Sequence, residues 1–391
     1  MKKILLFAGI SCALLATSCK PDAFSYHYYT PEEETILTQY LKLPELPADY
    51  AVTLPSYLSF GGLIGGGFAQ PPISSKVELG RVLFYDKNLS RDGKISCASC
   101  HKQELGFGDN ASVSKGVFGR SGERNSIALS AVPSFAGAYE NTGNSLFWDN
   151  RAKTVQEQSR ASLANTKEMD MSMPEVVAAV NNQPYYAVLF KKTFGDATAT
   201  EERVTEAIQG FVHALAAVQS KYDEAAQAAF NPSAPDFNFA SKDFSKFTAA
   251  ENRGKSIYLA NCSNCHTTTL TAPFIQSASN GLDLNPADLG AGGITHLTSD
   301  EGTFKVPALR NVALTAPYMH DGRFQTLEQV IEHYSSGIQQ HQNLHPELRN
   351  TDGSPKKFNF SQQDKDALLA FLNTLTDTKM VADVRYSDPF K

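Results

Sequence analysis

Two five-residue motifs of the form Cys-x-x-Cys-His are the clearest chemical signal in this sequence. They lie at residues 97–101 and 262–266. In such a motif, two thiols can add to the two vinyl groups of one porphyrin, and the adjacent histidine is then held beneath the iron as an axial ligand. We therefore predict two covalently bound c-type haems. Their attachment residues would be Cys97, Cys100 and His101 for one haem and Cys262, Cys265 and His266 for the other.

The same four cysteines could instead form a zinc site or two disulfide bonds. The separation between the pairs, from Cys100 to Cys262, is far longer than the spacing in a zinc ribbon. A disulfide within each pair would not explain why a histidine follows both pairs. The pattern therefore favours haem attachment over either alternative.

The N-terminus has the pattern of a secretory signal. Lys2 and Lys3 precede an apolar run at residues 4–15, which is too short to span a bilayer. Small residues at 16–18 then lead into Cys19, which resembles the cleavage site of a bacterial lipoprotein signal. We predict a signal peptide at residues 1–18, a lipid on Cys19 that anchors the chain to the membrane, and a periplasmic location. An ordinary cleaved signal would instead leave Cys19 as a free thiol.

The composition is that of a soluble globular protein with an acidic balance. The chain has 391 residues, of which 42% are hydrophobic and 19% charged, and its formal net charge is −6 at pH 7. This length exceeds what one hydrophobic core usually holds, so two domains are expected. The negative balance argues against a nucleic-acid partner. It could suit a basic electron-donor protein.

Residues 19–75 are predicted to form a lipid-anchored N-terminal tether. They are mixed in composition and contain a glycine-rich stretch at residues 61–67. No Gly-Lys-Ser/Thr follows that stretch, so it does not match a phosphate-binding loop, and a flexible tether is favoured.

From about Ser75 onward, apolar residues recur at helical spacing between long loops. One helix is predicted over residues 204–215 behind a capping box that begins at Thr198, and a closing helix over 368–375 behind Ser361. Alternating strand patterns are scarce. A polar stretch at residues 231–236 has the composition of a linker.

These patterns predict an all-α fold of two cytochrome c-like haem domains with long loops. The expected boundaries are residues 76–240 for the N-terminal domain and 241–391 for the C-terminal domain. Each domain would carry one of the two haem motifs.

The region from about residue 76 to 376 resembles the bacterial di-haem cytochrome c peroxidases and the related MauG enzymes. The markers of this resemblance occur in the family's order around the two haem motifs. They are Arg124-Asn125, the run 147–152, the pair Gln158 and Glu168, the run 306–312, and the run 315–322. The resemblance implies that the N-terminal domain binds peroxide and that the C-terminal domain transfers electrons.

Three residues acquire catalytic roles by this resemblance. Glu168 corresponds to the acid-base carboxylate above the peroxide-binding haem, Gln158 to its neighbouring amide, and Trp148 to an electron relay between the haems. A carboxylate can take a proton from the oxygen that binds iron and return it to the departing oxygen, while an amide can orient peroxide. Without the resemblance, Glu168 and Gln158 would be interpreted as surface residues and Trp148 as a core anchor.

A calcium site is also implied. Asn125, Thr315 and Pro317 match positions that bind this ion between the domains of the relatives. Oxygen ligands suit such a hard cation. The alternative is that asparagine and proline serve only to shape loops.

One departure from the family concerns the first haem. Many relatives have a histidine, in the loop after the first motif, that occupies the distal site until the second haem is reduced. Val117 stands at that position here, and no histidine occurs between His101 and His213. We therefore predict that the first haem is open in the oxidised protein.

The other departure concerns the second haem. Tyr334 stands where many relatives have a ligating methionine, and MauG enzymes also have tyrosine there. A phenolate ligand should lower the potential of this haem relative to methionine. Met319, His320 and His333 are competing candidates, and His320 is expected to serve as a hydrogen-bonding residue near the second haem.

The sequence thus predicts a di-haem peroxidase that reduces hydrogen peroxide with electrons from an external donor. One alternative is a MauG-like oxidase that modifies residues of a partner protein, and another is an electron-transfer cytochrome without catalysis. The expected partners are hydrogen peroxide, a small donor protein such as a c-type cytochrome or cupredoxin, the membrane through Cys19, and a second copy of the chain in a homodimer.

Overall fold

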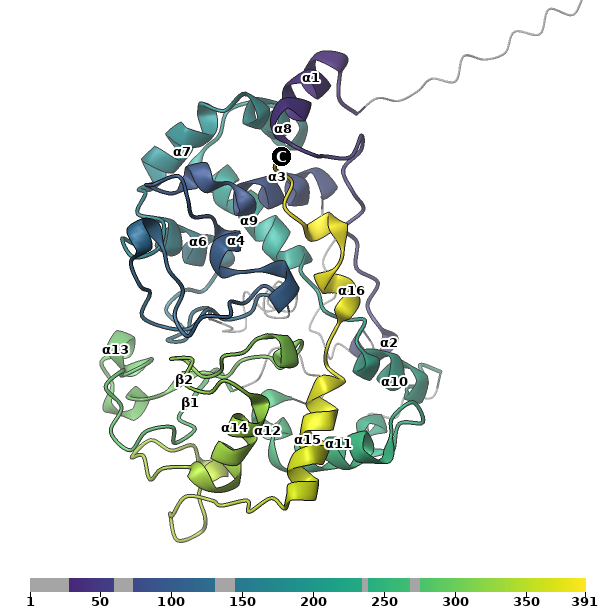
Figure 1. Cartoon of the computed structure of the whole chain (residues 1–391), viewed down its shortest axis with the longest axis vertical. Coiled ribbons are helices and arrows are strands. Elements are labelled where there is room, and N and C mark those ends of the chain that lie inside the picture. Colours follow the sequence, from purple (N-terminus) through teal and green to yellow (C-terminus); the bar gives the residue numbers. More distant parts are fainter. Residues whose placement is uncertain (1–27, 60–72, 131–144, 234–237, 268–274) are drawn as a thin grey trace, which may run out of the picture.

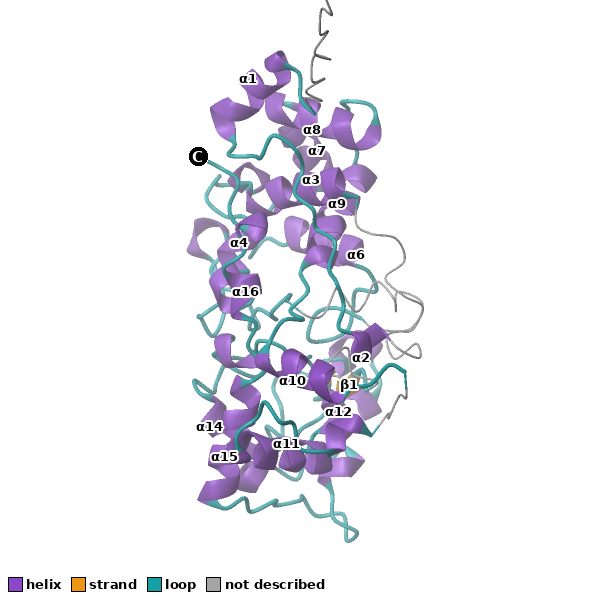
Figure 2. Cartoon of the chain, turned by 90° about the vertical axis from the view of Figure 1, so that its right-hand side faces the viewer, coloured by secondary structure: helices purple, strands orange, loops and turns teal. Residues whose placement is uncertain are grey.

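The computed structural model describes residues 28–59, 73–130, 145–233, 238–267 and 275–391. Helices and loops make up two lobes that lie end to end along the long axis of the molecule (Figures 1 and 2). The only paired strands within the described residues are β1 (Ser277–Ala278) and β2 (Phe304–Lys305), which are antiparallel. The expectation of a helical fold with little strand is confirmed.

The first lobe holds most of the helices from the N-terminal half of the chain. They are α1 (Pro31–Tyr40), α3 (Ser74–Tyr85), α4 (Cys97–Cys100), α6 (Val155–Ala164), α7 (Met173–Asn181), α8 (Pro184–Phe194) and α9 (Glu201–Ala214).

The second lobe lies below the first in Figure 1. Its helices are α2 (Ser56–Ser59), α10 (Lys221–Ala229), α11 (Ala249–Asn261), α12 (Ser263–His266), α13 (Gly292–Thr295), α14 (Leu327–Glu332) and α15 (Gln362–Asn373). Beyond α15, the short α16 (Thr378–Val381) begins the path of the chain back to the first lobe.

Helices α3 and α9 cross closely at Gly80. A Cβ atom on this glycine would lie 1.9 Å from the backbone oxygen of Ala207, so only glycine allows the two backbones to approach this closely. One turn further along α3, the ring of Phe84 packs against Phe211 with centroids 5.1 Å apart. Phe84 and Phe211 both belong to the first hydrophobic cluster.

The second lobe repeats this crossing with α11 and α15. A Cβ atom on Gly254 would lie 1.9 Å from the backbone oxygen of Ala367. Tyr258, four residues later, packs against Phe371 with ring centroids 5.0 Å apart. Both lobes are therefore built around the same arrangement of a glycine and two aromatic side chains.

Replacing Gly254 with valine should destabilise the second lobe by about 1–3 kcal/mol, because the added side chain would force α11 and α15 apart. Guanidinium unfolding of the haem-loaded protein measures this loss. Gly293→Ala is the matched control, since its added methyl group would meet nothing closer than Leu289 Cβ at 3.9 Å. Equal stability of the Gly254→Val and Gly293→Ala proteins would contradict the tight crossing.

The described part of the predicted tether is packed structure. Tyr29 and Tyr50 are buried in the first hydrophobic cluster, whereas Tyr57 and Leu58 are buried in the second. The segment therefore runs along both lobes, because its aromatic and aliphatic side chains find partners there. The glycine-rich stretch at 61–67, the predicted signal peptide and Cys19 lie outside the described residues.

The hydrophobic clusters do not follow the expected boundary at residue 240. Helix α10 precedes that residue, yet Tyr222 from this helix belongs to the second cluster. The C-terminal tail returns Met380 and Tyr386 to the first cluster, where Tyr386 Oη donates to the backbone oxygen of Ala214 at 3.0 Å. Packing therefore changes lobes near residue 216 and again after α15.

The two predicted helix caps have different outcomes. At α15, Ser361 and Asp364 form the expected capping box. At α9, the N-cap is Thr200 instead of Thr198, and its side chain accepts the backbone N–H of Arg203 at 3.3 Å. The sequence pattern located this helix but placed its start too early.

Candidate haem sites

A first cavity lies in the upper lobe beside the first haem motif. Cys97 and Cys100 occupy the single-turn helix α4, and both line the cavity together with His101. His101 Nδ1 lies 2.9 Å from the backbone oxygen of Phe107, which accepts its proton. Burial lowers the pKa of His101. A neutral ring held through Nδ1 leaves Nε2 as the nitrogen that can ligate iron.

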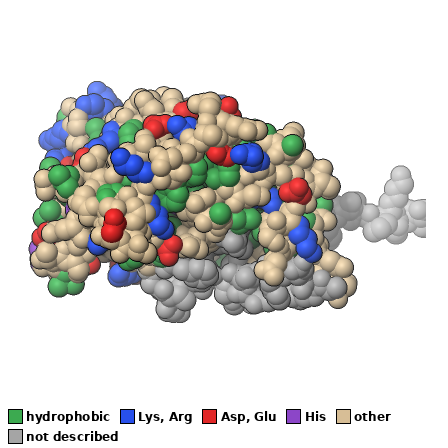
Figure 3. Space-filling model, turned by 90° about the horizontal axis from the view of Figure 1, so that it is seen from below, with side chains coloured by type: hydrophobic (Ala, Val, Ile, Leu, Met, Phe, Trp, Pro, Cys, Tyr) green, Lys and Arg blue, Asp and Glu red, His purple; other side chains and the backbone are tan. Residues whose placement is uncertain are grey.

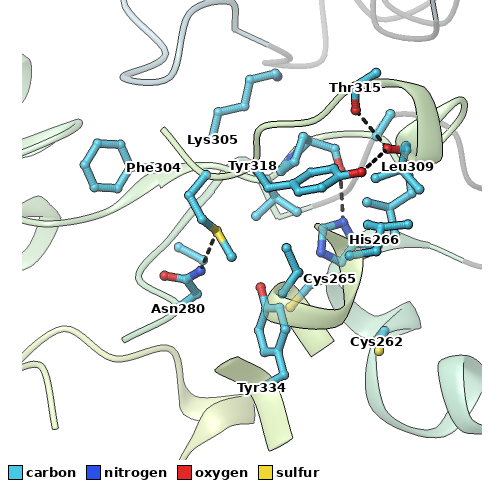
Figure 4. Close-up of a pocket in the computed structure, with 18 of the residues that line it drawn as sticks. Cys262, Cys265, His266, Asn280, Phe304, Lys305, Leu309, Thr315, Tyr318 and Tyr334 are labelled. Carbon is cyan, nitrogen blue, oxygen red and sulfur yellow. Dashed lines mark hydrogen bonds between the residues drawn. The ribbon is translucent and has the colours of Figure 1, made fainter. Parts of the chain in front are cut away.

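A second cavity in the lower lobe has the same construction. Cys262, Cys265 and His266 line it, and His266 Nδ1 lies 2.9 Å from the backbone oxygen of Pro307 (Figure 4). Burial lowers the pKa of His266 as well. The donor sets of both cavities therefore fit covalent haem attachment with one histidine ligand each.

The alternatives for the four cysteines find no support. All four are free thiols, and the two pairs line different cavities. Burial raises the pKa of Cys97 to about 12 and that of Cys262 to about 12, so the unmodified thiols stay protonated. In the described ranges, no group of three or more His, Cys, Asp or Glu side chains could hold a metal ion.

Glu168 and Gln158 both line the first cavity, as predicted for residues that act on a ligand there. Asn165 Nδ2 donates to Glu168 Oε1 at 2.7 Å, and Gln158 Nε2 donates to Ser162 Oγ at 3.0 Å. Burial is the main cause that raises the pKa of Glu168. A carboxyl group with a raised pKa in a cavity can serve as both base and acid near neutral pH.

The loop that carries Val117 holds Glu168 in place. Val117 is buried, and its backbone N–H donates to the backbone oxygen of Glu168 at 2.8 Å. Gly116 lies so close that a Cβ atom there would meet Lys167 O at 2.1 Å. Val117, which the resemblance matches to the distal histidine of many relatives, thus supports the backbone of the candidate acid-base residue.

Within the described lining of the first cavity, His101 is the only histidine. Met169 is another potential iron ligand that the sequence did not single out, because a thioether can ligate haem. Its side chain is buried in the first hydrophobic cluster. In the sequence, a methionine next to Glu168 is interpreted as an ordinary apolar residue.

Six residues line both cavities and therefore lie between them. They are Asn125, Ser126, Ile127, Ala128, Trp148 and Lys305. Trp148 Nε1 donates to the backbone oxygen of Asn125 at 2.9 Å, and Lys305 N donates to the backbone oxygen of Trp148 at 2.7 Å. These bonds hold Trp148 between the two cavities, and its role as an electron relay stays a prediction.

Asn125, Thr315 and Pro317 all line the second cavity. Asn125 Nδ2 donates to the backbone oxygens of Ala111 and Ser112 at 3.1 and 3.3 Å, and Thr315 Oγ1 donates to that of Val312 at 3.1 Å. These bonds give each polar side chain a role in shaping its loop. A calcium ion at these residues stays a prediction.

Tyr334 lines the second cavity, and Figure 4 shows its hydroxyl directed toward the space beside Cys265 and His266. Helix α14 ends at Glu332 and continues as a π-helix over His333–Gly337. Such turns change the direction in which side chains point and are frequent at functional sites. Burial raises the pKa of Tyr334 to about 12.

The three competitors of Tyr334 differ in position. His333 does not line the second cavity, and its Nε2 lies 3.1 Å from the backbone oxygen of Asn280. His320 lines the cavity but stacks on Phe304 with ring centroids 3.8 Å apart. Met319 also lines it, and its sulfur accepts Asn280 Nδ2 at 3.5 Å. Of these four residues, Tyr334 and Met319 are therefore the strongest candidates for a second ligand.

Comparisons with known proteins agree with this geometry. A family model described as di-haem cytochrome c peroxidase matches residues 74–230. The chain is 33% identical to "Methylamine utilization protein MauG" of Methylorubrum extorquens over 315 residues, which cover 78% of this chain and 80% of that protein. It is 34% identical over 271 residues to "Cytochrome c551 peroxidase" of Nitrosomonas europaea, which cover 67% of this chain and 73% of that protein.

Among solved structures, a MauG-like protein associated with microbial copper homeostasis is similar with a TM-score of 0.66 and 31% identity. The match covers 81% of this chain and 93% of that one. The relatives thus include proteins named as peroxidases and proteins named as MauG.

Proposed function

Because this chain belongs to the family of di-haem cytochrome c peroxidases and MauG proteins, we propose that it reduces hydrogen peroxide to water with electrons from an external donor protein. The family implies two c-type haems. The observation that carries the proposal is the placement of Glu168 in the same cavity as His101, with Gln158 beside it. A cytochrome that only carries electrons needs no such acid-base group.

When bound, the haem would supply an iron that can bind one oxygen of peroxide and pass electrons to it. Glu168 would take the proton from that oxygen and return it to the other oxygen, which departs as water. Gln158 would donate a hydrogen bond that orients the peroxide. Two electrons and two protons in total would convert one peroxide into two waters. The external donor would supply the electrons, and Trp148, which lines both cavities, would relay them between the two haem sites.

At the second haem site, we propose that His266 and Tyr334 would hold the iron. Burial raises the pKa of the Tyr334 phenol to about 12, so Tyr334 would have to release its proton to solvent to hold the iron as a phenolate. The positive charge of the iron would favour that release. A hard, anionic oxygen ligand then favours the ferric state.

Tyr334→Phe should change the absorption and electron paramagnetic resonance spectra of the second haem and leave those of the first unchanged. Tyr318→Phe is the matched control, because this tyrosine lines the same cavity but donates its hydroxyl to the backbone oxygen of Val312 at 2.9 Å. An unchanged spectrum for Tyr334→Phe would make Met319 the better ligand candidate.

A second candidate function is the oxidation of residues in a partner protein. Tyr334 favours it, because MauG enzymes carry tyrosine at this position, and several relatives are named MauG. Steady-state turnover with peroxide and a small reduced cytochrome distinguishes the functions. Fast turnover supports the peroxidase, an oxidised partner protein without fast turnover supports the second function, and no reaction with peroxide contradicts both.

The external electron donor and the attachment of the protein to a membrane are also proposals. On the face shown in Figure 3, lysine, arginine and acidic side chains are interspersed around an apolar centre. The negative net charge of the chain therefore does not produce one large acidic surface on that face. No helix in the described ranges is long and apolar enough to cross a membrane. We propose that a lipid on Cys19 supplies the membrane attachment.

A further inference from the structure

Lys305 is the only ionisable residue among the six that line both cavities. It lies on β2, and its side chain is 5% exposed. Figure 4 shows the side chain extending from the strand away from Tyr334. Its Nζ donates to the backbone oxygen of Ser145 at 2.7 Å.

The other cations that line the two cavities each have a carboxylate partner within 4 Å. These ion pairs are Arg124 with Asp149 and Asp288, Arg151 with Asp149, Lys167 with Glu123, and Arg310 with Asp223. Lys305 has no such carboxylate among the described residues. Burial alone lowers its pKa to about 8.

A buried ammonium without a counter-ion is costly, because one carbonyl replaces little of the hydration that it loses. A neutral side chain of similar size would avoid this cost. A haem brings two carboxylates of its own on its propionate groups, and both cavities fit a haem. Lys305 lacks a carboxylate partner in the described part of the chain, and the propionate groups that the haems would bring are carboxylates.

We propose that Lys305 is a carboxylate-binding site shared by the two haem cavities, where its ammonium holds a haem propionate and places one positive charge between the two cavities. A positive charge stabilises the reduced form of each haem, so it raises both reduction potentials. Lys305 is thus a positioning residue that raises the potentials of both haems. The inference depends on the presence of two haems and not on peroxidase turnover.

Spectroelectrochemistry of the haem-loaded protein, without peroxide, tests this inference. Lys305→Gln removes the charge while its amide can still donate to Ser145, and we expect both reduction potentials to fall. The propionate bending band in the resonance Raman spectrum should also shift. Lys153→Gln is the matched control, because Lys153 donates to Ser145 Oγ at 2.8 Å but is exposed and lines neither cavity. Its potentials and its Raman spectrum should match those of the wild type.

Each contrary outcome has a defined meaning. A fall in the potential of one haem alone would overturn the shared site, and a fall in both without a Raman shift would overturn carboxylate binding. Unchanged potentials would overturn the proposal as a whole. Lys305→Arg keeps the charge and should keep both potentials near those of the wild type. If Lys305→Gln fails to retain both haems, a fall in the potentials of Lys305→Arg would still contradict the proposal.

Discussion

Replacing Glu168 with glutamine is expected to slow the reaction with hydrogen peroxide by a factor of about 10² or more, the usual scale for a positioned acid-base group. The fold and both haems should be retained. Glutamine has the same shape, and its Oε1 can still accept the hydrogen bond from Asn165. The variant also removes a carboxyl group whose ionised form is disfavoured by burial. Stopped-flow absorption of the ferric protein mixed with peroxide measures the rate.

The pH dependence of this rate provides a second readout. A base must be deprotonated to accept a proton, so the wild-type rate should fall as pH drops through the raised pKa of Glu168. The glutamine variant should lose that dependence. Glu157→Gln is the matched control, because Glu157 lies on α6 next to Gln158 but is exposed and does not line the cavity. Equal rates for the two variants would remove the role assigned to Glu168.

The strongest sequence predictions depended on local patterns with a fixed spacing. The Cys-x-x-Cys-His motifs predicted two haem sites, and the structure gives each motif its own cavity. Apolar periodicity behind Ser361 predicted helix α15 and its capping box. The family resemblance is confirmed by the comparisons. Within one helix or one motif, neighbours in sequence are also neighbours in space, so such patterns predict local structure from the sequence alone.

Properties that depend on distant parts of the chain could not be predicted in the same way. Tyr57 donates to Asp223 Oδ1 at 2.5 Å, and Asp223 pairs with the buried Arg310 that lines the second cavity. No local pattern shows that a residue of the presumed tether completes this ion pair. The role of Lys305 was invisible for the same reason, because it follows from two cavities that come together only in the folded chain.

The positions of Glu168 and Gln158 show an intermediate case. The resemblance identified both residues, but it did not reveal what holds them. Gly116 and Val117 pack against the backbone of residues 167 and 168, which requires a loop from a distant part of the chain. Val117, where the resemblance predicts that a distal histidine is missing, therefore makes a structural contact with Glu168.

Replacing Cys262 and Cys265 together with serine should remove one of the two haems. The thiols are the only groups that can bond covalently to its vinyl carbons, and His266 alone would leave a reversible complex. Mass spectrometry of the mature wild-type protein should show two haem additions, and the double variant one. The absorption bands of the first haem should remain, because its attachment residues line a different cavity.

The mirror change at Cys97 and Cys100 should remove the other haem and, with it, the reaction with peroxide. The two double variants thus separate the predicted roles of the cavities. Replacing Cys97 and Cys100 should abolish peroxide binding. Replacing Cys262 and Cys265 should abolish electron supply and leave peroxide binding intact. Cys19→Ser is the control for cysteine replacement, since it should retain both haems and lose only the proposed lipid. A single haem addition in the wild type would contradict the two-haem prediction, and retained peroxide binding without Cys97 and Cys100 would place the reaction in the second cavity.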